Sequence, residues 1–238
     1  MEVKLDLRIQ PQPDEVTCGP TCLHAVYDYF GDSIPLDQVI REVPMLDGGG
    51  TLSVLLGCHA LKRGYRARIY SYNVQVFDPT WFDLDRPRII GKLEEQIAQR
   101  TDEKLRTASE GYLRFLQLGG ELRFNDLNRG LIRHHLNQRV PILTGLSATY
   151  LYRCAREFGP NLDYDDIRGE PSGHFVVLRG YNRDTRTVDV ADPLRPNPAA
   201  REQQRYTVEI DRVICAILLG ILTYDATLLL IRPKSKSP

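Results

Sequence analysis

The amino-acid sequence predicts an α+β fold in which an N-terminal helical part packs on a C-terminal antiparallel sheet. Apolar residues from 22 to 30 recur at helical spacing, and similar segments follow in the first half of the chain. Residues 174–181 and 187–192, by contrast, form two β-rich runs separated by a turn. The 238 residues are enough to bury one sizeable core, so we predict a single domain over residues 1–238.

Composition and charge argue against several classes of partner. The 31 basic and 31 acidic residues cancel, so no overall field attracts nucleic acid or anionic lipid. The five cysteines are odd in number and scattered, unlike the disulfide framework of a small secreted protein. The N-terminus lacks the uninterrupted apolar core of a signal peptide. We therefore expect a cytoplasmic protein that binds neither nucleic acid nor membrane, and the sequence gives no signal about its oligomeric state.

The first half contains the predicted helices in order. Alternating apolar residues from Val3 to Ile9 predict a short strand, which two prolines end. Pro20 suits the first turn of the next helix and Gly31 suits its end, so Cys18 lies at a loop-to-helix junction. The charged segment from Gly91 to Ser109 predicts one solvated surface helix. The other predicted elements are helices at 36–42, 52–63 and 127–139, strands at 65–70 and 140–146, and a flexible GGG connection at 48–50.

The second half is predicted to be mostly β. The turn NRDTR at 182–186 joins the two β-rich runs into an antiparallel hairpin. Because the second strand returns toward the start of the first, Asp192 is expected to lie beside His174. The acidic segment 161–173 runs directly into His174. It is either a solvated loop or a lid over a site.

One apolar run, 213–231, is long enough to cross a membrane. It contains Asp225 and follows Arg212, and charges inside a bilayer are costly. We interpret this run as a helix at 212–222, a turn near Asp225 and a buried strand at 227–231. Residues 233–238 form a polar, flexible tail.

A cysteine at the start of a helix is a candidate nucleophile. A thiol attacks carbonyl carbon as its thiolate, and an ordinary pKa of about 8.5 leaves little thiolate near neutral pH. For Cys18 the helix N-terminus can supply positive potential, and His174 can accept the proton. Asp192 can hold the imidazole in the required tautomer. A side-chain amide upstream can bind the oxyanion, and both Gln10 and Gln12 are candidates.

Each of these residues also has an ordinary structural interpretation. A lone cysteine is usually an inert buried thiol, and an aspartate before Pro193 often begins a turn. Cys22 is expected in the core, and a metal site with Cys18 and His24 lacks a second ligand pair of suitable spacing. We predict neither a metal nor another cofactor. The remaining cysteines, in apolar surroundings, are expected to be packing residues: Cys58, Cys154 and Cys215.

The joint pattern resembles a known family. Gln12, then Cys18 and Gly19 before a helix, and much later GHFVVLRGY with the pair Asp192-Pro193, are similar to the papain-like bacteriocin-processing peptidases that cleave double-glycine leaders. The resemblance implies a papain-like cysteine peptidase fold with the site in the cleft between helices and sheet. It also implies the role of each residue: Cys18 as nucleophile, His174 as base, Asp192 as orienting group and Gln12, favoured over Gln10 by the family's spacing, as oxyanion donor.

The resemblance covers part of the chain. Its motifs span residues 10–31 and 172–193, and Thr17 stands where many relatives carry aspartate. The segments near 71–125 and 150–172 are longer than such a domain needs, so we expect them to be insertions. The sequence contains no transporter segment, so we do not expect a leader peptidase fused to an export pump, nor that the family's natural substrate carries over.

These residues predict a cysteine peptidase or amidase. We expect it to hydrolyse a peptide or amide bond through a Cys-His-Asp triad and a thioester acyl-enzyme. A papain-like acyltransferase would use the same intermediate and deliver it to an amine or thiol. A peptide-binding module that does not cleave is the alternative outside enzymes, but a pure binder has no need of a thiolate.

Overall fold

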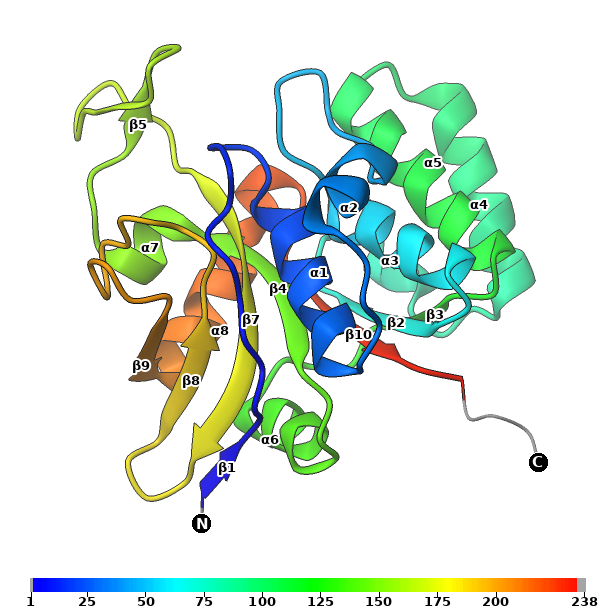
Figure 1. Cartoon of the computed structure of the whole chain (residues 1–238). Helices are drawn as coiled ribbons and strands as arrows, with labels where there is room; N and C mark the ends of the chain where they lie inside the picture. Colours follow the sequence, from blue (N-terminus) through cyan, green and yellow to red (C-terminus); the bar gives the residue numbers. More distant parts are fainter. Residues whose placement is uncertain (1, 235–238) are drawn as a thin grey trace.

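The computed structural model describes residues 2–234, in which eight strands form one mixed sheet and two more form a separate hairpin. The strands are β1 (Glu2–Lys4), β2 (Arg66–Ser71), β3 (Glu121–Arg123), β4 (Ile142–Ser147), β5 (Glu157–Phe158), β6 (Asp163–Tyr164), β7 (Gly173–Asn182), β8 (Thr187–Ala191), β9 (Arg205–Glu209) and β10 (Thr227–Arg232). The sheet order is β3-β2-β10-β4-β7-β8-β9, and β1 pairs with β7 (Figure 1). Within the sheet, only β2 and β3 are paired in parallel.

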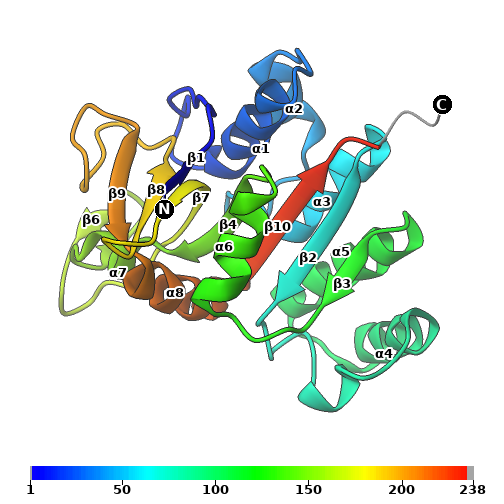
Figure 2. The ribbon, with the colours of Figure 1, turned by 90° about the horizontal axis from the view of Figure 1, so that it is seen from below.

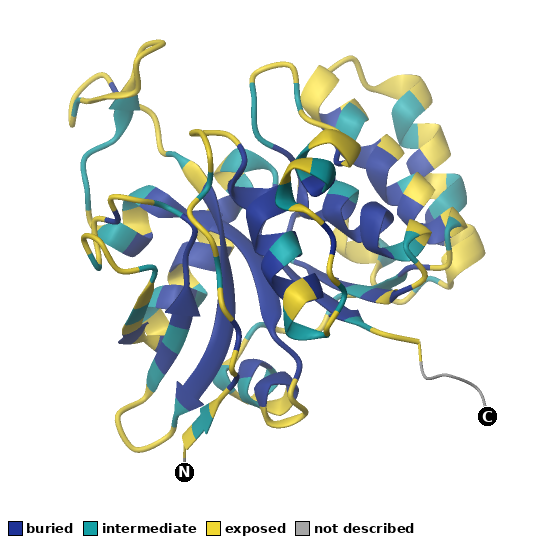
Figure 3. Ribbon diagram, viewed as in Figure 1, coloured by how far each residue is buried: buried dark blue, intermediate teal, exposed yellow. Residues whose placement is uncertain are grey.

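Helices cover both faces of this sheet. They are α1 (Cys18–Tyr29), α2 (Leu36–Glu42), α3 (Ser53–Lys62), α4 (Arg86–Gln99), α5 (Glu103–Gln117), α6 (Arg129–Asn137), α7 (Ala148–Tyr152) and α8 (Ile210–Leu219), with short 3-10 helices η1 (Pro79–Trp81) and η2 (Gly220–Thr223). One core lies between the sheet and α1 to α5, and a second lies between the sheet and α6 to α8 (Figure 2). The sheet is therefore buried on both faces along its centre (Figure 3).

The central strand β7 shows why its sequence lacks a polar alternation. Phe175 and Val177 face the first core, whereas Val176 and Leu178 face the second. Successive side chains of a strand point to opposite faces, so a strand covered on both sides needs apolar residues at every position. Burial of each such side chain contributes about 1.5–3 kcal/mol. This requirement accounts for the run FVVL that follows His174.

The predicted α+β class is confirmed, and most elements lie within two residues of their predicted positions. The predicted hairpin at 174–192 and the division of 213–231 into helix, turn and strand are also present. Among the described residues no helix is long and apolar enough to span a bilayer. The sheet is larger than expected, because β1, β2 and β3, all before residue 124, also belong to it.

Two predictions about elements are wrong. The strand expected over 3–9 ends at Lys4, where pairing with Gly180 stops, although Leu5 and Leu7 remain buried. The single surface helix expected over 91–109 is two helices, because the carboxylate of Asp102 accepts the Leu105 N–H at 2.7 Å and caps a new helix, α5.

The two expected insertions have different structures. Segment 71–125 contains α4, α5 and β3, and α5 packs on α3 so closely that a Cβ on Gly57 would lie 2.8 Å from the ring of Phe115. Segment 150–172 contains the β5–β6 hairpin, which projects from the molecule (Figure 1). Of the predicted tail, residues 235–238 lie outside the described residues.

The position of α5 in the core predicts a large effect for one substitution. Phe115 is completely buried, so Phe115→Ala should lower the free energy of unfolding by about 3–5 kcal/mol through the cavity that it leaves. Gln117→Ala, on the exposed side of the same helix, should change it by less than about 0.5 kcal/mol. Urea unfolding of both variants measures the difference. Equal effects would contradict the packing of α5 described here.

Candidate active site

Cys18 is the first residue of α1, at the junction that the sequence predicted. Its neighbour Gly19 has no room for a side chain, since a Cβ there would lie 2.6 Å from Thr51 Cγ2 and 3.2 Å from the ring of Phe175. The start of α1 therefore packs directly against Thr51, which precedes α3, and against Phe175 of β7. Cys18 as a whole is 8% exposed, and it lines a hollow of the surface.

His174 and Asp192 lie side by side at the end of the β7–β8 hairpin, as expected. His174 Nε2 is 2.9 Å from Asp192 Oδ1, and the two residues are 8% and 0% exposed. Cys18 lies near enough to His174 to be among the groups that raise the pKa of its imidazole. Because Nε2 faces the carboxylate, Nδ1 is the ring nitrogen left for the thiol. The imidazole and Cys18 also line the same hollow.

The charges of His174 and Asp192 strongly shift each other's pKa. Burial alone would lower the pKa of His174, but the charges of Asp192 and Cys18 and the hydrogen bonds with both raise this pKa to about 10. Burial alone would raise the pKa of Asp192, but the charge of His174 and hydrogen bonds, among them those from His174 and Tyr152, hold this pKa below its ordinary value. At neutral pH the pair therefore consists of imidazolium and carboxylate.

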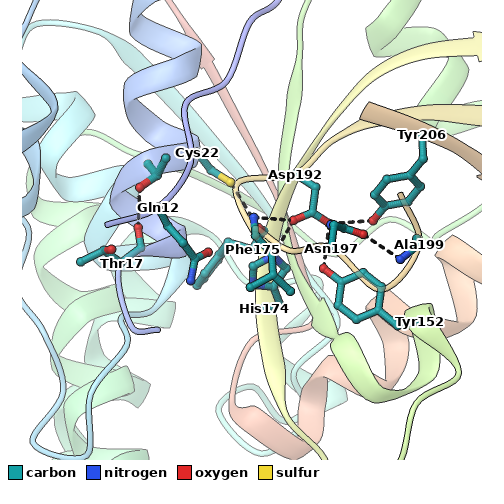
Figure 4. A network of polar contacts seen from close by, with 12 residues as sticks. Gln12, Thr17, Cys22, Tyr152, His174, Phe175, Asp192, Asn197, Ala199 and Tyr206 are labelled. Carbon is teal, nitrogen blue, oxygen red and sulfur yellow. Dashed lines mark hydrogen bonds and ion pairs between the residues drawn. The ribbon is translucent and has the colours of Figure 1, made fainter. Parts of the chain in front are cut away.

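Two tyrosines that sequence reasoning missed hold the carboxylate from the other side. Tyr152 and Tyr206 each donate a hydrogen bond of 2.7 Å to Asp192 Oδ2, opposite His174 (Figure 4). The Leu194 N–H donates to Oδ1 at 3.0 Å. Tyr152 ends α7 and Tyr206 belongs to β9, and neither element was predicted. The proximity of either tyrosine to Asp192 has no local signal in the sequence.

Gln12 reaches the same region, whereas Gln10 is exposed. The backbone N–H of Gln12 donates to Pro193 O at 2.9 Å, which fixes the N-terminal segment beside the end of the hairpin. Its Nε2 donates to Asp14 O at 2.8 Å, and one of the two amide hydrogens remains for another acceptor. Gln12 lines a hollow together with His174.

Two hollows meet at Gly173 and His174. One, of about 270 Å³, is lined by Cys18 and Asp225, and the other, of about 250 Å³, is lined by Gln12 and Tyr152. A larger cavity, of about 620 Å³, lies elsewhere, between α4 and the edge strand β3, and no cysteine or histidine lines it. The two smaller hollows are therefore the better candidates for binding a chain across the thiol.

Cys22 and Cys215 have no comparable surroundings, whereas Cys154 lines the hollow that contains Gln12 and His174. Cys22 is buried one turn after Cys18, its thiol donates to Phe175 O at 3.2 Å, and burial raises its pKa. The expectation of a packing role is wrong for Cys215, which is exposed because α8 buries Ile210, Val213, Ala216 and Ile217 instead. Among residues 2–234 no group of three or more His, Cys, Asp or Glu side chains is arranged so that it could hold a metal ion.

Comparisons with known proteins give structural neighbours alone. No protein-family model and no curated protein matches the chain. A double-glycine motif protease from an AMS/PCAT transporter, solved with its leader peptide, has a TM-score of 0.45 and 12% identity, over 98% of this chain and 95% of its own. The peptidase domain of Streptococcus ComA, a bifunctional ABC transporter of a quorum-sensing pathway, has a TM-score of 0.44 and 14% identity, over 96% and 99%. Xylellain, a cysteine protease from Xylella fastidiosa, has a TM-score of 0.41 and 12% identity, over 98% and 86%.

The raised pKa of His174 predicts how stability depends on pH. A group whose pKa rises on folding stabilises the protein fully below its unfolded pKa, near 6.5 for histidine, and loses this effect as pH rises through the folded pKa, here about 10. The loss of stability caused by His174→Gln should therefore be greatest at pH 6 and decrease toward pH 10. Urea unfolding of the wild type and of His174→Gln at pH 6, 8 and 10 measures the difference in their free energy of unfolding. A difference that stays constant over this range would contradict the charge state inferred for the pair.

Proposed function

We propose that the chain is a cysteine peptidase or amidase that hydrolyses a peptide or amide bond through a thioester acyl-enzyme. The observation that carries the proposal is a buried imidazole that is hydrogen-bonded to Asp192 and lines the same hollow as Cys18. This arrangement is the one required of an imidazole that takes the proton of a thiol, holds it as imidazolium and is itself oriented by a carboxylate. The order of the residues in the chain agrees with the family that the sequence resembles.

Acylation begins with attack of the Cys18 thiolate on the carbonyl carbon of the substrate. The carbonyl π electrons move to oxygen, and the resulting oxyanion accepts hydrogen bonds from Gln12 Nε2 and from the Cys18 N–H. The first N–H groups of a helix have no partner within the helix, so the latter is available. Collapse of this intermediate breaks the C–N bond, and the imidazolium of His174 gives its proton to the departing amine.

Deacylation returns the site to its starting state. His174, now neutral, removes a proton from water as the water attacks the thioester carbonyl. The second tetrahedral intermediate expels the Cys18 thiolate and leaves a carboxylic acid product. The proton taken from water remains on His174, so the thiolate and imidazolium are restored. Asp192 stays ionised throughout and stabilises the imidazolium.

A peptide substrate fits the shape of the site, because the two hollows extend to either side of His174. The chemistry also requires that Cys18 stay reduced. We therefore propose a reducing, cytoplasmic setting, and the five free cysteines are consistent with it.

Selective labelling tests the nucleophile. A peptide carrying a thiol-directed electrophile should modify Cys18 faster than Cys215, even though Cys215 is the more exposed thiol. His174→Ala should slow this labelling, and Cys18→Ala should abolish turnover of reporter peptides while the protein stays folded. Peptide mapping by mass spectrometry identifies the modified residue. Modification of Cys215 with Cys18 untouched would overturn the assignment.

The two glutamines provide a matched pair for the oxyanion role. Gln12→Ala should lower kcat about a hundredfold with little change in KM, since the lost hydrogen bond forms only with the developing oxyanion. Gln10→Ala removes the same group two residues away and should leave kcat within about twofold of the wild type. Steady-state kinetics on one reporter peptide compare the two variants. A larger loss of kcat in Gln10→Ala would transfer the role to that residue.

A further inference from the structure

The hollow beside Cys18 contains a feature that the proposed reaction does not use. Its lining combines apolar residues and glycines with polar residues, and Asp225 is among the latter. Cys18 and His174 line the same space, so a substrate bound to the thiol extends within reach of this side chain. The other ionisable side chains that line the hollow besides His174 are Tyr224 and the exposed Lys104 and Glu170.

Asp225 is built into the floor between η2 and β10. It is 6% exposed, and its Oδ1 accepts the Ser53 N–H at 3.0 Å, at the first residue of α3. Gly145 of β4 leaves space for it, since a Cβ at Gly145 would lie 2.6 Å from Asp225 Cγ. Within residues 2–234 no lysine, arginine or histidine forms an ion pair with Asp225. The hydrogen bonds to this buried carboxyl therefore come from Ser53, through its backbone N–H and its side chain, and no described cation pairs with it.

The backbone around Asp225 is held in an unusual conformation. Tyr224 and Ala226, on either side, have φ of +66° and +52°, in the left-handed region that favours glycine. Asn73 Nδ2 donates to Tyr224 O at 2.9 Å, and the Tyr72 N–H donates to Ala226 O at 3.0 Å, so both strained residues are tied down. Strain of this kind costs about 1–3 kcal/mol per residue and is concentrated at functional sites.

The carboxyl also bears an electrostatic cost. Burial raises the pKa of Asp225 to about 7, which means that the charged form of its carboxyl is poorly stabilised at this position. A cation that enters the hollow would relieve this cost by pairing with the carboxylate. A role limited to capping α3 does not need an acid, because the amide oxygen of asparagine accepts the same N–H.

We propose that this hollow is a specificity pocket, in which Asp225 binds the cationic side chain of a substrate lysine or arginine next to the bond that Cys18 attacks. This inference rests on the proposed function for the meaning of "substrate". Leu46, Leu52 and Leu222 in the lining of the hollow would pack against the methylene groups of such a side chain, and Asp225 would meet the ammonium or guanidinium group. The space of about 270 Å³ is of a size that admits one long side chain.

The test compares arginine with citrulline, its uncharged analogue of nearly equal shape. Internally quenched peptides carry one or the other at each position flanking the cleaved bond. At one position the wild-type protein should show kcat/KM about tenfold higher for arginine, the size of effect expected from one ion pair in a partly buried site. Asp225→Asn, which keeps the hydrogen-bond acceptor for Ser53, should bring this ratio close to 1 with little change for citrulline. Asp126→Asn, the same change on a distant exposed loop, should keep the wild-type ratio.

Two results would overturn the pocket: equal rates for arginine and citrulline in the wild type, or a preference that survives in Asp225→Asn. The first needs no variant, so the proposal remains testable even if Asp225→Asn fails to fold. Binding of the same peptides to Cys18→Ala, followed by fluorescence anisotropy, separates this inference from the proposed function. If the wild type cleaves none of the peptides but the variant binds arginine peptides more tightly than citrulline peptides, the pocket is supported and the proposed hydrolase function is contradicted. If Cys18 is labelled and the peptides are cleaved but arginine is not preferred, the proposed function is supported and the pocket is overturned.

Discussion

The buried contact between His174 and Asp192 is the interaction on which the candidate site depends. Removing two charges from water costs several kcal/mol per ion, and their attraction compensates only when the remaining hydrogen-bonding positions are also filled. Here the carboxylate accepts four hydrogen bonds, from His174, from the Leu194 N–H and from the hydroxyls of Tyr152 and Tyr206. The pair is therefore fixed by four separate segments of the chain.

The position of this pair depends on how the strands and helices around it are packed. The β7–β8 hairpin brings the two residues together, and β4 pairs with β7 through His174 itself, whose register partner is Leu146. In the helical layer, Cys18 begins α1, and its neighbour Gly19 lets the start of this helix pack closely against Thr51 and Phe175. The thiol and the imidazole thus belong to different layers, the helical layer and the sheet. Their contact requires that these layers pack in one arrangement.

The sequence predicts what local chemistry determines. Helical spacing and the end signals Pro20 and Gly31 located α1, and the length of the hairpin was enough to bring Asp192 beside His174. It did not predict the tyrosines on Asp192, since α7 and β9 are short and their contacts join distant segments. The break at Asp102 was missed because one acidic residue in a charged stretch looks like surface, although it is also a helix cap. The apolar run before β10 was divided correctly because Asp225 interrupts it, but its position in the hollow depends on packing against Gly145.

The last described strand, β10, is not at an edge of the sheet. It lies between β2 and β4, with Leu229 opposite Ile69 on one side and Leu143 on the other. During synthesis β10 leaves the ribosome after the nine strands that precede it, so the centre of the sheet stays open until β10 has emerged. Pairings between residues so distant in sequence form slowly. A nascent chain therefore carries the hairpin with His174 and Asp192 before the hydrophobic centre of the sheet is closed, and completion of the candidate site waits for β10.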